Sequence, residues 1–221
     1  MTSAEGGGAS VRYPRLPVML DVAGRRCIVV GGGEVGAERA RTLKEHGARV
    51  TVVSPETSAP LGEMLLAGDI DEHHKRPFEA GDVVGCSMVV AATDDRGVNA
   101  SVAAAAAREG VPCNVAGSGA RGDVVLPAVL RRGPLTVAVS TGGTSPRLAR
   151  LVRDRMGREY DEAWGELVQL IGELRADLEG VPADERDAVM GRMVDGPAPA
   201  MIAGGAGCDR VKLALRRELG R

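Results

Sequence analysis

Residues 26–36 read RCIVVGGGEVG, and this stretch is the strongest indication of the fold. The run CIVV at 27–30 is continuously apolar, which is typical of a strand buried on both faces of a parallel sheet. Glycines follow at once, and residues 34–47 then read EVGAERARTLKEHG, a helical pattern that stops at a glycine. A second strand, RVTVV, follows at 49–53. This order of strand, tight turn, helix and strand predicts a βαβ unit.

The glycines Gly31, Gly33 and Gly36 have the spacing G-x-G-x-x-G between the predicted strand and helix. In dinucleotide-binding folds the first glycine allows a sharp turn, the second lets the backbone approach a pyrophosphate, and the third lets helix and strand pack closely. The N-terminus of the helix then attracts the phosphates. An ordinary tight turn without ligand is the alternative, and the strand and helix on either side favour the dinucleotide site.

The second strand ends at Ser54, where dinucleotide-binding folds usually carry an acidic residue for the ribose hydroxyls. The sequence there is SPET at 54–57, so Glu56 is the candidate for ribose binding. Glu56 can equally be a carboxylate in the first turn of a helix, stabilised by the helix dipole. Because SPET contains no arginine for a 2′-phosphate, NAD is favoured over NADP.

Strands and helices continue to alternate as far as residue 117, which predicts an open, mostly parallel sheet. The strand MVVAAT at 88–93 ends on Thr93, a candidate cofactor contact, and one of Asp94 and Asp95 is expected to cap the next helix. Beyond residue 117 two strand-like segments are joined without a crossover helix, which indicates an antiparallel pair. Residues 145–178 then predict one or two amphipathic helices that bury Leu148 and Leu151.

Composition bounds the function as well. The 28 Lys and Arg residues nearly balance the 30 Asp and Glu residues, so the chain has no large net charge that would attract a nucleic acid or a membrane surface. The start lacks a signal-peptide pattern, and no apolar run approaches the roughly 20 residues of a membrane span, so a cytoplasmic location is expected. The four cysteines and three histidines lack metal-ligand spacing, so no metal site is predicted.

From Leu16 to Leu174 the chain resembles the precorrin-2 dehydrogenase and sirohydrochlorin ferrochelatase family of siroheme synthesis. The stretches that carry the resemblance are LPVMLDVAGRRCIVVGGGEVGAERARTLKEHGARVTVVSPE at 16–56, VVAATDDRGVN at 89–99, CNVAG at 113–117 and, most specific, VLPAVLRRGPLTVAVSTGGTSPRLARLVR at 125–153. The resemblance implies an α/β fold working as a homodimer: a Rossmann dinucleotide-binding domain, a small antiparallel dimerisation region and a helical C-terminal part. We expect a disordered tail at 1–15, the NAD-binding domain at 16–122, the dimerisation region at 123–146 and the helical region at 147–221.

In that family NAD⁺ takes a hydride from precorrin-2 to yield sirohydrochlorin, and some members also insert Fe²⁺ to make siroheme. We therefore expect NAD as cofactor, a tetrapyrrole as substrate and precorrin-2 dehydrogenation as the reaction. Two alternatives remain open at this point. One is a bifunctional enzyme that is also a ferrochelatase, and the other is a non-catalytic Rossmann module that senses NAD(H).

The resemblance also suggests site residues. It places Glu34, Val35, Pro55 and Glu56 along the nucleotide. The candidates for contacts with the substrate and its carboxylates are Asn114, Ser140, Thr141, Arg147 and Arg150. The alternatives are turn-stabilising hydroxyls for the serine and threonine, and a solvated helix face for the arginines.

The sequence departs from the family pattern at the expected proton acceptor. The family often has an aspartate at this position, where this chain has Gly117. Asp123, a few residues further on, is the candidate catalytic residue in its place, and water is the alternative acceptor. Glycine can neither accept nor donate a proton. This departure weighs against ferrochelatase activity more than against dehydrogenation.

Overall fold

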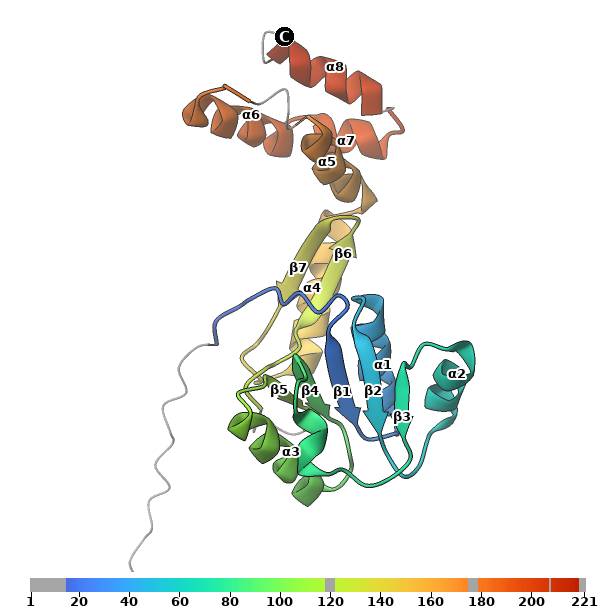
Figure 1. The fold of residues 1–221 in the computed structure, drawn as a ribbon. Coiled ribbons are helices and arrows are strands. Elements are labelled where there is room, and N and C mark those ends of the chain that lie inside the picture. The colour runs from blue at the N-terminus through green and yellow to red at the C-terminus, as the bar shows by residue number, and fades with distance from the viewer. Residues whose placement is uncertain (1–14, 118–121, 175–178, 207, 219–221) are drawn as a thin grey trace, which may run out of the picture. The chain divides into compact units, whose positions relative to one another are not determined.

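The computed structural model describes residues 15–117, 122–174, 179–206 and 208–218. The chain divides into two compact units, Met1–Leu126 and Pro127–Arg221 (Figure 1). Of the tail predicted at residues 1–15, all but Arg15 lies outside the described residues.

The first unit contains a five-stranded sheet in the order β3-β2-β1-β4-β5, with every neighbouring pair parallel. Its strands are β1 (Arg26–Val30), β2 (Arg49–Val53), β3 (Glu72–His74), β4 (Met88–Ala91) and β5 (Cys113–Val115). The strand order reverses between β1 and β4. In open parallel sheets, ligands bind outside the carboxyl ends of the strands at such a reversal. The predicted parallel sheet is confirmed.

Helices cover both faces of this sheet. The helices of the unit are α1 (Glu34–Glu45), α2 (Ala59–Ala67), the 3₁₀ helix η1 (Ala80–Val83) and α3 (Arg96–Arg108). One core cluster joins α1 and α2 to side chains such as Val29, and the other joins α3 and η1 to side chains such as Ile28. Adjacent residues of β1 thus point into opposite cores, which explains why this strand is apolar throughout.

The second unit begins with an antiparallel hairpin of β6 (Ala128–Arg132) and β7 (Leu135–Val139), in which Arg132 pairs with Leu135 across the turn. The helices α4 (Pro146–Glu159) and α5 (Glu162–Glu173) follow. They are separated at Asp161, whose side chain accepts a hydrogen bond from the N–H of Ala163 and so caps α5. The antiparallel pair and the amphipathic helices are both confirmed.

Three further helices, α6 (Ala183–Asp195), α7 (Ala198–Ala203) and α8 (Cys208–Glu218), complete the unit. They share a core with α5 that includes Leu167, Leu170 and Val211. The helix α7 lies in the region 147–221 that was expected to be helical, although the stretch around it is rich in glycine and proline. Proline is nevertheless tolerated in the first turn of a helix, where its missing N–H would have no intrahelical partner.

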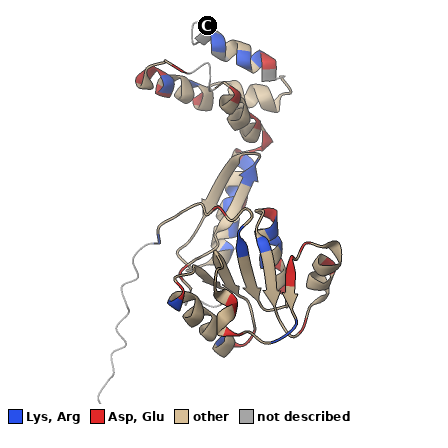
Figure 2. Ribbon diagram, in the orientation of Figure 1, with Lys and Arg blue, Asp and Glu red and all other residues tan. Residues whose placement is uncertain are grey.

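The helix α4 corrects one expectation. Leu148 and Leu151 were expected to be buried, yet they are 50% and 57% exposed, and Ala149 is the buried residue of this helix. The same helix carries five arginines, and Figure 2 shows basic residues along it. Among the described residues, α4 therefore presents a surface that is both apolar and basic.

The described residues were also expected to lack membrane spans and metal ligands. No helix there combines the length and apolar character needed to cross a bilayer. The same residues contain no group of three or more His, Cys, Asp and Glu side chains placed to hold a metal ion.

Candidate functional site

The glycine turn between β1 and α1 is shaped by close backbone packing. Gly31 has φ +121°, a conformation that favours glycine, and a Cβ on it would collide with the carbonyl oxygen of Ala92. A Cβ on Gly36 would in turn collide with the carbonyl oxygen of Gly31. These two glycines are therefore required by the packing of the protein itself, as the first and third positions of the predicted motif should be.

Gly33 differs, because a Cβ placed on it would meet no protein atom within 4 Å. Gly33 is the N-cap of α1, and no side chain caps the helix there. The first N–H groups of a helix have no intrahelical partners and lie at the positive end of its dipole. The turn therefore offers a pyrophosphate both hydrogen-bond donors and the space that a side chain would fill. Glu34 and Val35, also predicted to line the nucleotide, are exposed on this first turn.

The turn that follows β2 lies against this glycine turn. Ser54 is buried, and its Oγ donates a hydrogen bond to the carbonyl oxygen of Glu56 at 2.6 Å. The N–H of Ser58 donates to the carbonyl oxygen of Gly32 at 2.7 Å. Pro55 and Glu56 are exposed. The structure thus brings the candidate ribose-binding residues next to the candidate phosphate loop, and their contact with a nucleotide stays a prediction.

Thr93 lies on the other side of the glycine turn, just beyond β4. Its hydroxyl lies 2.9 Å from Oδ1 of Asn99, which also accepts the Thr93 N–H, and Asn99 Nδ2 donates to the Thr93 carbonyl at 2.7 Å. Asn99 is buried, so these bonds hold the loop after β4 in place. The cap expected from Asp94 or Asp95 is confirmed for Asp95, whose carboxylate accepts two N–H groups of α3.

The substrate and proton candidates of the first unit lie at β5. Asn114 is buried, and its Nδ2 donates to the carbonyl oxygen of Val124 at 2.9 Å. Asp123 is exposed. The chain returns to the start of β5 at this point, because the N–H of Val124 donates to the Cys113 carbonyl. Gly117, by contrast, follows the carboxyl end of β5. The role of Asp123 as proton acceptor stays a prediction, and β4 separates β5 from β1, the strand that leads into the glycine turn.

The remaining candidates belong to the second unit. Thr141 Oγ1 donates to the carbonyl of Ser145 and accepts its N–H, both at 3.0 Å, while Ser140 Oγ accepts a backbone N–H in the same turn. Ser145 in turn caps α4. The turn-stabilising role considered for both hydroxyls is thus present. Arg147 and Arg150 are exposed on the first turns of α4.

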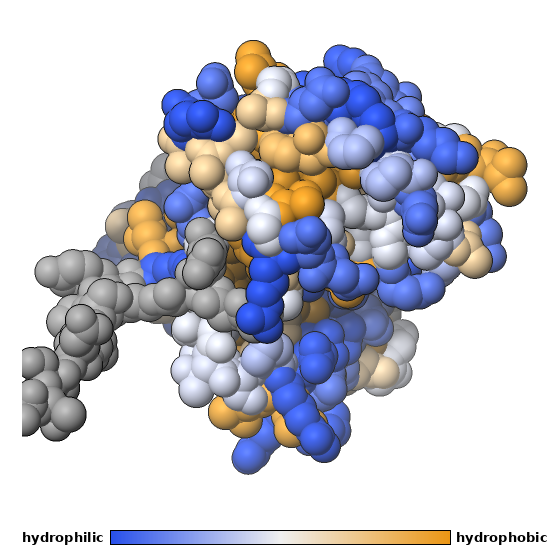
Figure 3. Space-filling model, turned by 90° about the horizontal axis from the view of Figure 1, so that it is seen from below, coloured by the Kyte–Doolittle hydropathy of each residue, from blue (hydrophilic) through white to orange (hydrophobic). Residues whose placement is uncertain are grey.

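Figure 3 views the molecule toward the carboxyl ends of the parallel strands, and apolar residues gather near the middle of this face with hydrophilic residues around them. The doubly wound sheet, the glycine turn at its strand-order reversal and the open helix N-terminus at Gly33 together define a class. This is a dinucleotide-binding protein of the Rossmann type.

Comparison with known families gives the assignment. A family described as putative NAD(P)-binding matches residues 18–128, and the chain belongs to it. A second family, described as sirohaem biosynthesis protein central, matches residues 132–159, which contain β7 and α4.

Individual relatives extend the likeness over most of the chain. A siroheme synthase of Pseudomonas fluorescens (strain SBW25) is 35% identical over 207 residues, which cover 93% of this chain and 44% of the relative. A siroheme synthase of Pseudomonas aeruginosa (strain UCBPP-PA14) is 41% identical over 160 residues, which cover 72% of this chain and 34% of the relative. The chain thus spans less than half the length of these relatives. The solved structure of SirC, precorrin-2 dehydrogenase, aligns with a TM-score of 0.71 and 26% identity, covering 91% of this chain and 99% of SirC.

Sequence reasoning did not assign roles to Gly32, Ser54 and Asn99, which shape the loops of this site. Gly32 occupies a position that the G-x-G-x-x-G motif leaves free. Ser54 was noted only as the place where an acidic residue was expected. Asn99 lies inside the stretch VVAATDDRGVN, and the available signal in the sequence was a polar residue six positions after Thr93. The structure shows that this residue is buried.

Proposed function

We propose that this chain is an NAD-dependent precorrin-2 dehydrogenase, which converts precorrin-2 to sirohydrochlorin. The observation that carries the proposal is the open N-terminus of α1 at Gly33, which has no side-chain cap and where an added Cβ would meet no protein atom within 4 Å. This open helix N-terminus occurs in a chain that is similar over 91% of its length to SirC, precorrin-2 dehydrogenase.

The residues fit the cofactor as follows. The backbone N–H groups that begin α1 bind the pyrophosphate, with Gly33 leaving room for its approach. Glu56 accepts hydrogen bonds from the adenosine ribose, and the loop at Thr93 borders the site. NAD⁺ supplies a hydride acceptor when bound. The turn at 54–57 contains no cation for a 2′-phosphate, which favours NAD over NADP.

The substrate carries many carboxylates, which charge-assisted hydrogen bonds from arginine would hold. Arg147 and Arg150, both exposed at the start of α4, are proposed for this role, with Asn114, Ser140 and Thr141 as further contacts. Each turnover transfers one hydride from precorrin-2 to NAD⁺ and releases one proton. Asp123, exposed beside the start of β5, is proposed to accept that proton, and water is the alternative acceptor.

The test is an anaerobic comparison of NAD⁺ and NADP⁺ as oxidants of enzymatically generated precorrin-2. We expect sirohydrochlorin to form with NAD⁺ and at least tenfold more slowly with NADP⁺ at equal concentration, because a 2′-phosphate would face Glu56 without a cation. Adding Fe²⁺ after the reaction distinguishes the bifunctional alternative, which predicts siroheme faster than in the protein-free control. Tight NAD⁺ binding without oxidation of precorrin-2 would instead support the sensing module.

We also propose that the chain works as a homodimer through the hairpin and α4. Leu148, Leu151 and Val152 of α4 and Val129 of β6 are all at least 38% exposed, and such apolar surface marks an interface. A second copy of the chain is the proposed occupant. Leu151→Glu should shift the mass measured by light scattering from dimer to monomer, while Leu66→Glu, the same change at an exposed leucine of α2, should not. A monomeric parent protein would contradict the proposal.

A cytoplasmic location is proposed as well. Cys27, Cys86 and Cys113 are buried and free, as expected where thiols are kept reduced. Fractionation of the producing cells should recover the protein with cytoplasmic markers, and recovery from an oxidising compartment would contradict this.

A further inference from the structure

Gly32 is the middle residue of the first G-x-G, a position that the motif leaves free, yet here it has no room for a side chain. A Cβ on Gly32 would collide with the carbonyl oxygen of Glu56 and would lie 2.7 Å from Ser54 Oγ. The carbonyl oxygen of Gly32 also accepts the Ser58 N–H at 2.7 Å. The turn of residues 54–58 therefore lies directly on the phosphate loop.

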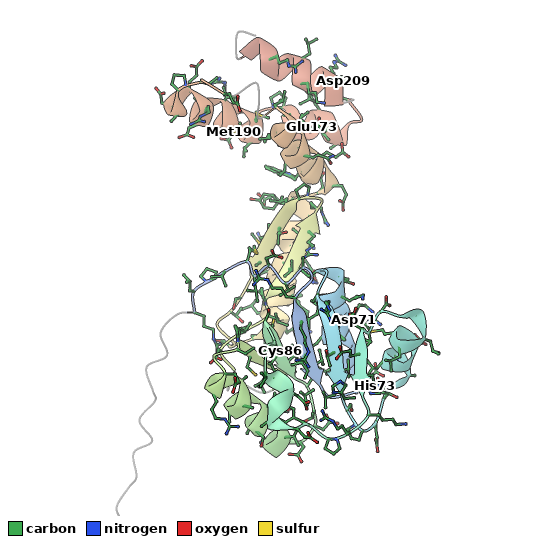
Figure 4. The ribbon with its side chains drawn as sticks, in the orientation of Figure 1. Asp71, His73, Cys86, Glu173, Met190 and Asp209 are labelled. Carbon is green, nitrogen blue, oxygen red and sulfur yellow. The ribbon has the colours of Figure 1, made fainter. Side chains whose placement is uncertain are left out.

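Ser54 closes this turn from inside. Its side chain is buried, and its single O–H donates to the carbonyl oxygen of Glu56 at 2.6 Å. Its N–H donates to the carbonyl oxygen of His74 on β3, the strand that also carries His73 (Figure 4). The turn is thus attached to a neighbouring strand at one end and to the phosphate loop at the other. Glu56 itself remains exposed.

This arrangement explains why an acidic residue is missing from the end of β2. A carboxylate at position 54 would face the carbonyl oxygen of Glu56, and two acceptors cannot satisfy each other. A serine in that place donates instead, and the carboxylate available to the adenosine ribose lies two residues further on, at Glu56.

We propose that Ser54 and Gly32 are positioning residues for ribose recognition, which set the place of the Glu56 carboxylate relative to the phosphate loop. The inference rests on the NAD site of the proposed function and names residues beyond it. Neither residue needs to touch the cofactor. Ser54 acts through Glu56, so its contribution to affinity depends on the Glu56 side chain.

The chain offers a matched control in the same turn. The Ser58 hydroxyl is buried and has no hydrogen-bond partner among the described residues. Ser58→Ala therefore removes a hydroxyl from the same turn without breaking a bond, whereas Ser54→Ala removes the bond to the Glu56 carbonyl. Melting temperatures of both variants report whether the fold is retained.

The experiment measures affinity by calorimetry for NAD⁺ and for ADP-ribose, which carries the adenosine ribose without the nicotinamide. Ser54→Ala should weaken both ligands about 3- to 10-fold, the effect expected from loss of one hydrogen bond. Ser58→Ala should leave both affinities within twofold. In a Glu56→Ala background the change Ser54→Ala should have little further effect, because the group that it positions is gone.

Three results would overturn the inference. One is an unchanged affinity in Ser54→Ala, even with a lowered melting temperature, which would make the residue structural only. Another is a full additional loss in the Glu56→Ala background, and the third is an equal loss in Ser58→Ala. If the parent protein binds neither ligand, the proposed function fails together with this inference. If the parent binds and Ser54→Ala is silent, only the inference fails.

Discussion

Replacing Gly33 or Gly36 by alanine should separate the glycine that the cofactor requires from one that the fold requires. Gly33 has extended backbone angles that alanine also adopts, and its added Cβ would meet no protein atom within 4 Å. The Cβ of Gly36→Ala would collide with the carbonyl oxygen of Gly31. One substitution therefore adds a methyl group to open space and the other adds it to a packed contact.

The expected magnitudes follow from this difference. In Gly33→Ala the free energy of unfolding should stay the same or rise by about 0.4–1 kcal/mol, because alanine restricts the unfolded chain. Its methyl group occupies the approach of the pyrophosphate, and loss of one charge-assisted hydrogen bond, about 1.5–3 kcal/mol, weakens binding roughly 10- to 150-fold. Gly36→Ala overpacks the contact between α1 and the turn, which costs about 1–3 kcal/mol of stability and also weakens binding.

Urea unfolding gives the stability of each variant, and calorimetric titration with NAD⁺ gives its affinity. The account predicts an affinity loss without a stability loss in Gly33→Ala, and both losses in Gly36→Ala. Unchanged NAD⁺ affinity in Gly33→Ala would refute the assignment of this turn as the phosphate-binding loop, whatever Gly36→Ala does.

Three further predictions concern the surrounding structure. Asp95→Ala should lower the free energy of unfolding by about 1 kcal/mol through loss of the α3 cap. Asp94→Ala, at an exposed neighbouring residue, should not lower it. Equal free energies of unfolding for the two variants would contradict the role of Asp95 as the cap. The Arg76 guanidinium, 2.6 Å from Asp82, holds the pKa of that carboxyl below its usual range. Asp82→Asn should therefore cost about 1–3 kcal/mol at pH 7. Because a lowered pKa stabilises the fold only while the carboxyl is ionised, that cost should shrink in urea titrations as the pH falls below about 4, and a constant cost would contradict this. Burial raises the pKa of Cys113 to about 11, so about one thiol in a thousand is ionised at pH 8. Mass spectrometry should therefore show that iodoacetamide labels Cys113 far more slowly in the folded protein than in the protein unfolded in urea. Similar labelling rates in the two states would contradict this.

The sequence predicted the strand, glycine turn and helix correctly because G-x-G-x-x-G depends on local order along the chain. Gly31 and Gly36 pack as that spacing requires, and Gly33 faces open space. The roles of Gly32 and Ser54 could not be predicted in the same way. They depend on which distant turn lies on the phosphate loop, and that contact is set by the pairing of β1 with β2 and not by any motif.

Helical periodicity had a similar limit in the second unit. The spacing of apolar residues predicted α4 but could not say what covers each face of it, and Leu148 and Leu151 prove to be exposed. The helix α7 lies in the region expected to be helical, but its own bounds were not predicted, since its proline and the flanking glycines are usual in loops. Sequence order also gave no sign that the chain at Val124 returns to Cys113 at the start of β5, because that backbone hydrogen bond depends on the fold.

A single-turnover reaction of the chain with precorrin-2 and NAD⁺ under anaerobic conditions, followed by the absorbance of sirohydrochlorin and NADH, tests whether this protein is a precorrin-2 dehydrogenase. The account predicts one NADH for each sirohydrochlorin formed, with a rate that falls at subsaturating NAD⁺ in Gly33→Ala. Sirohydrochlorin formed without NADH, or no oxidation by a protein that binds NAD⁺, would contradict it.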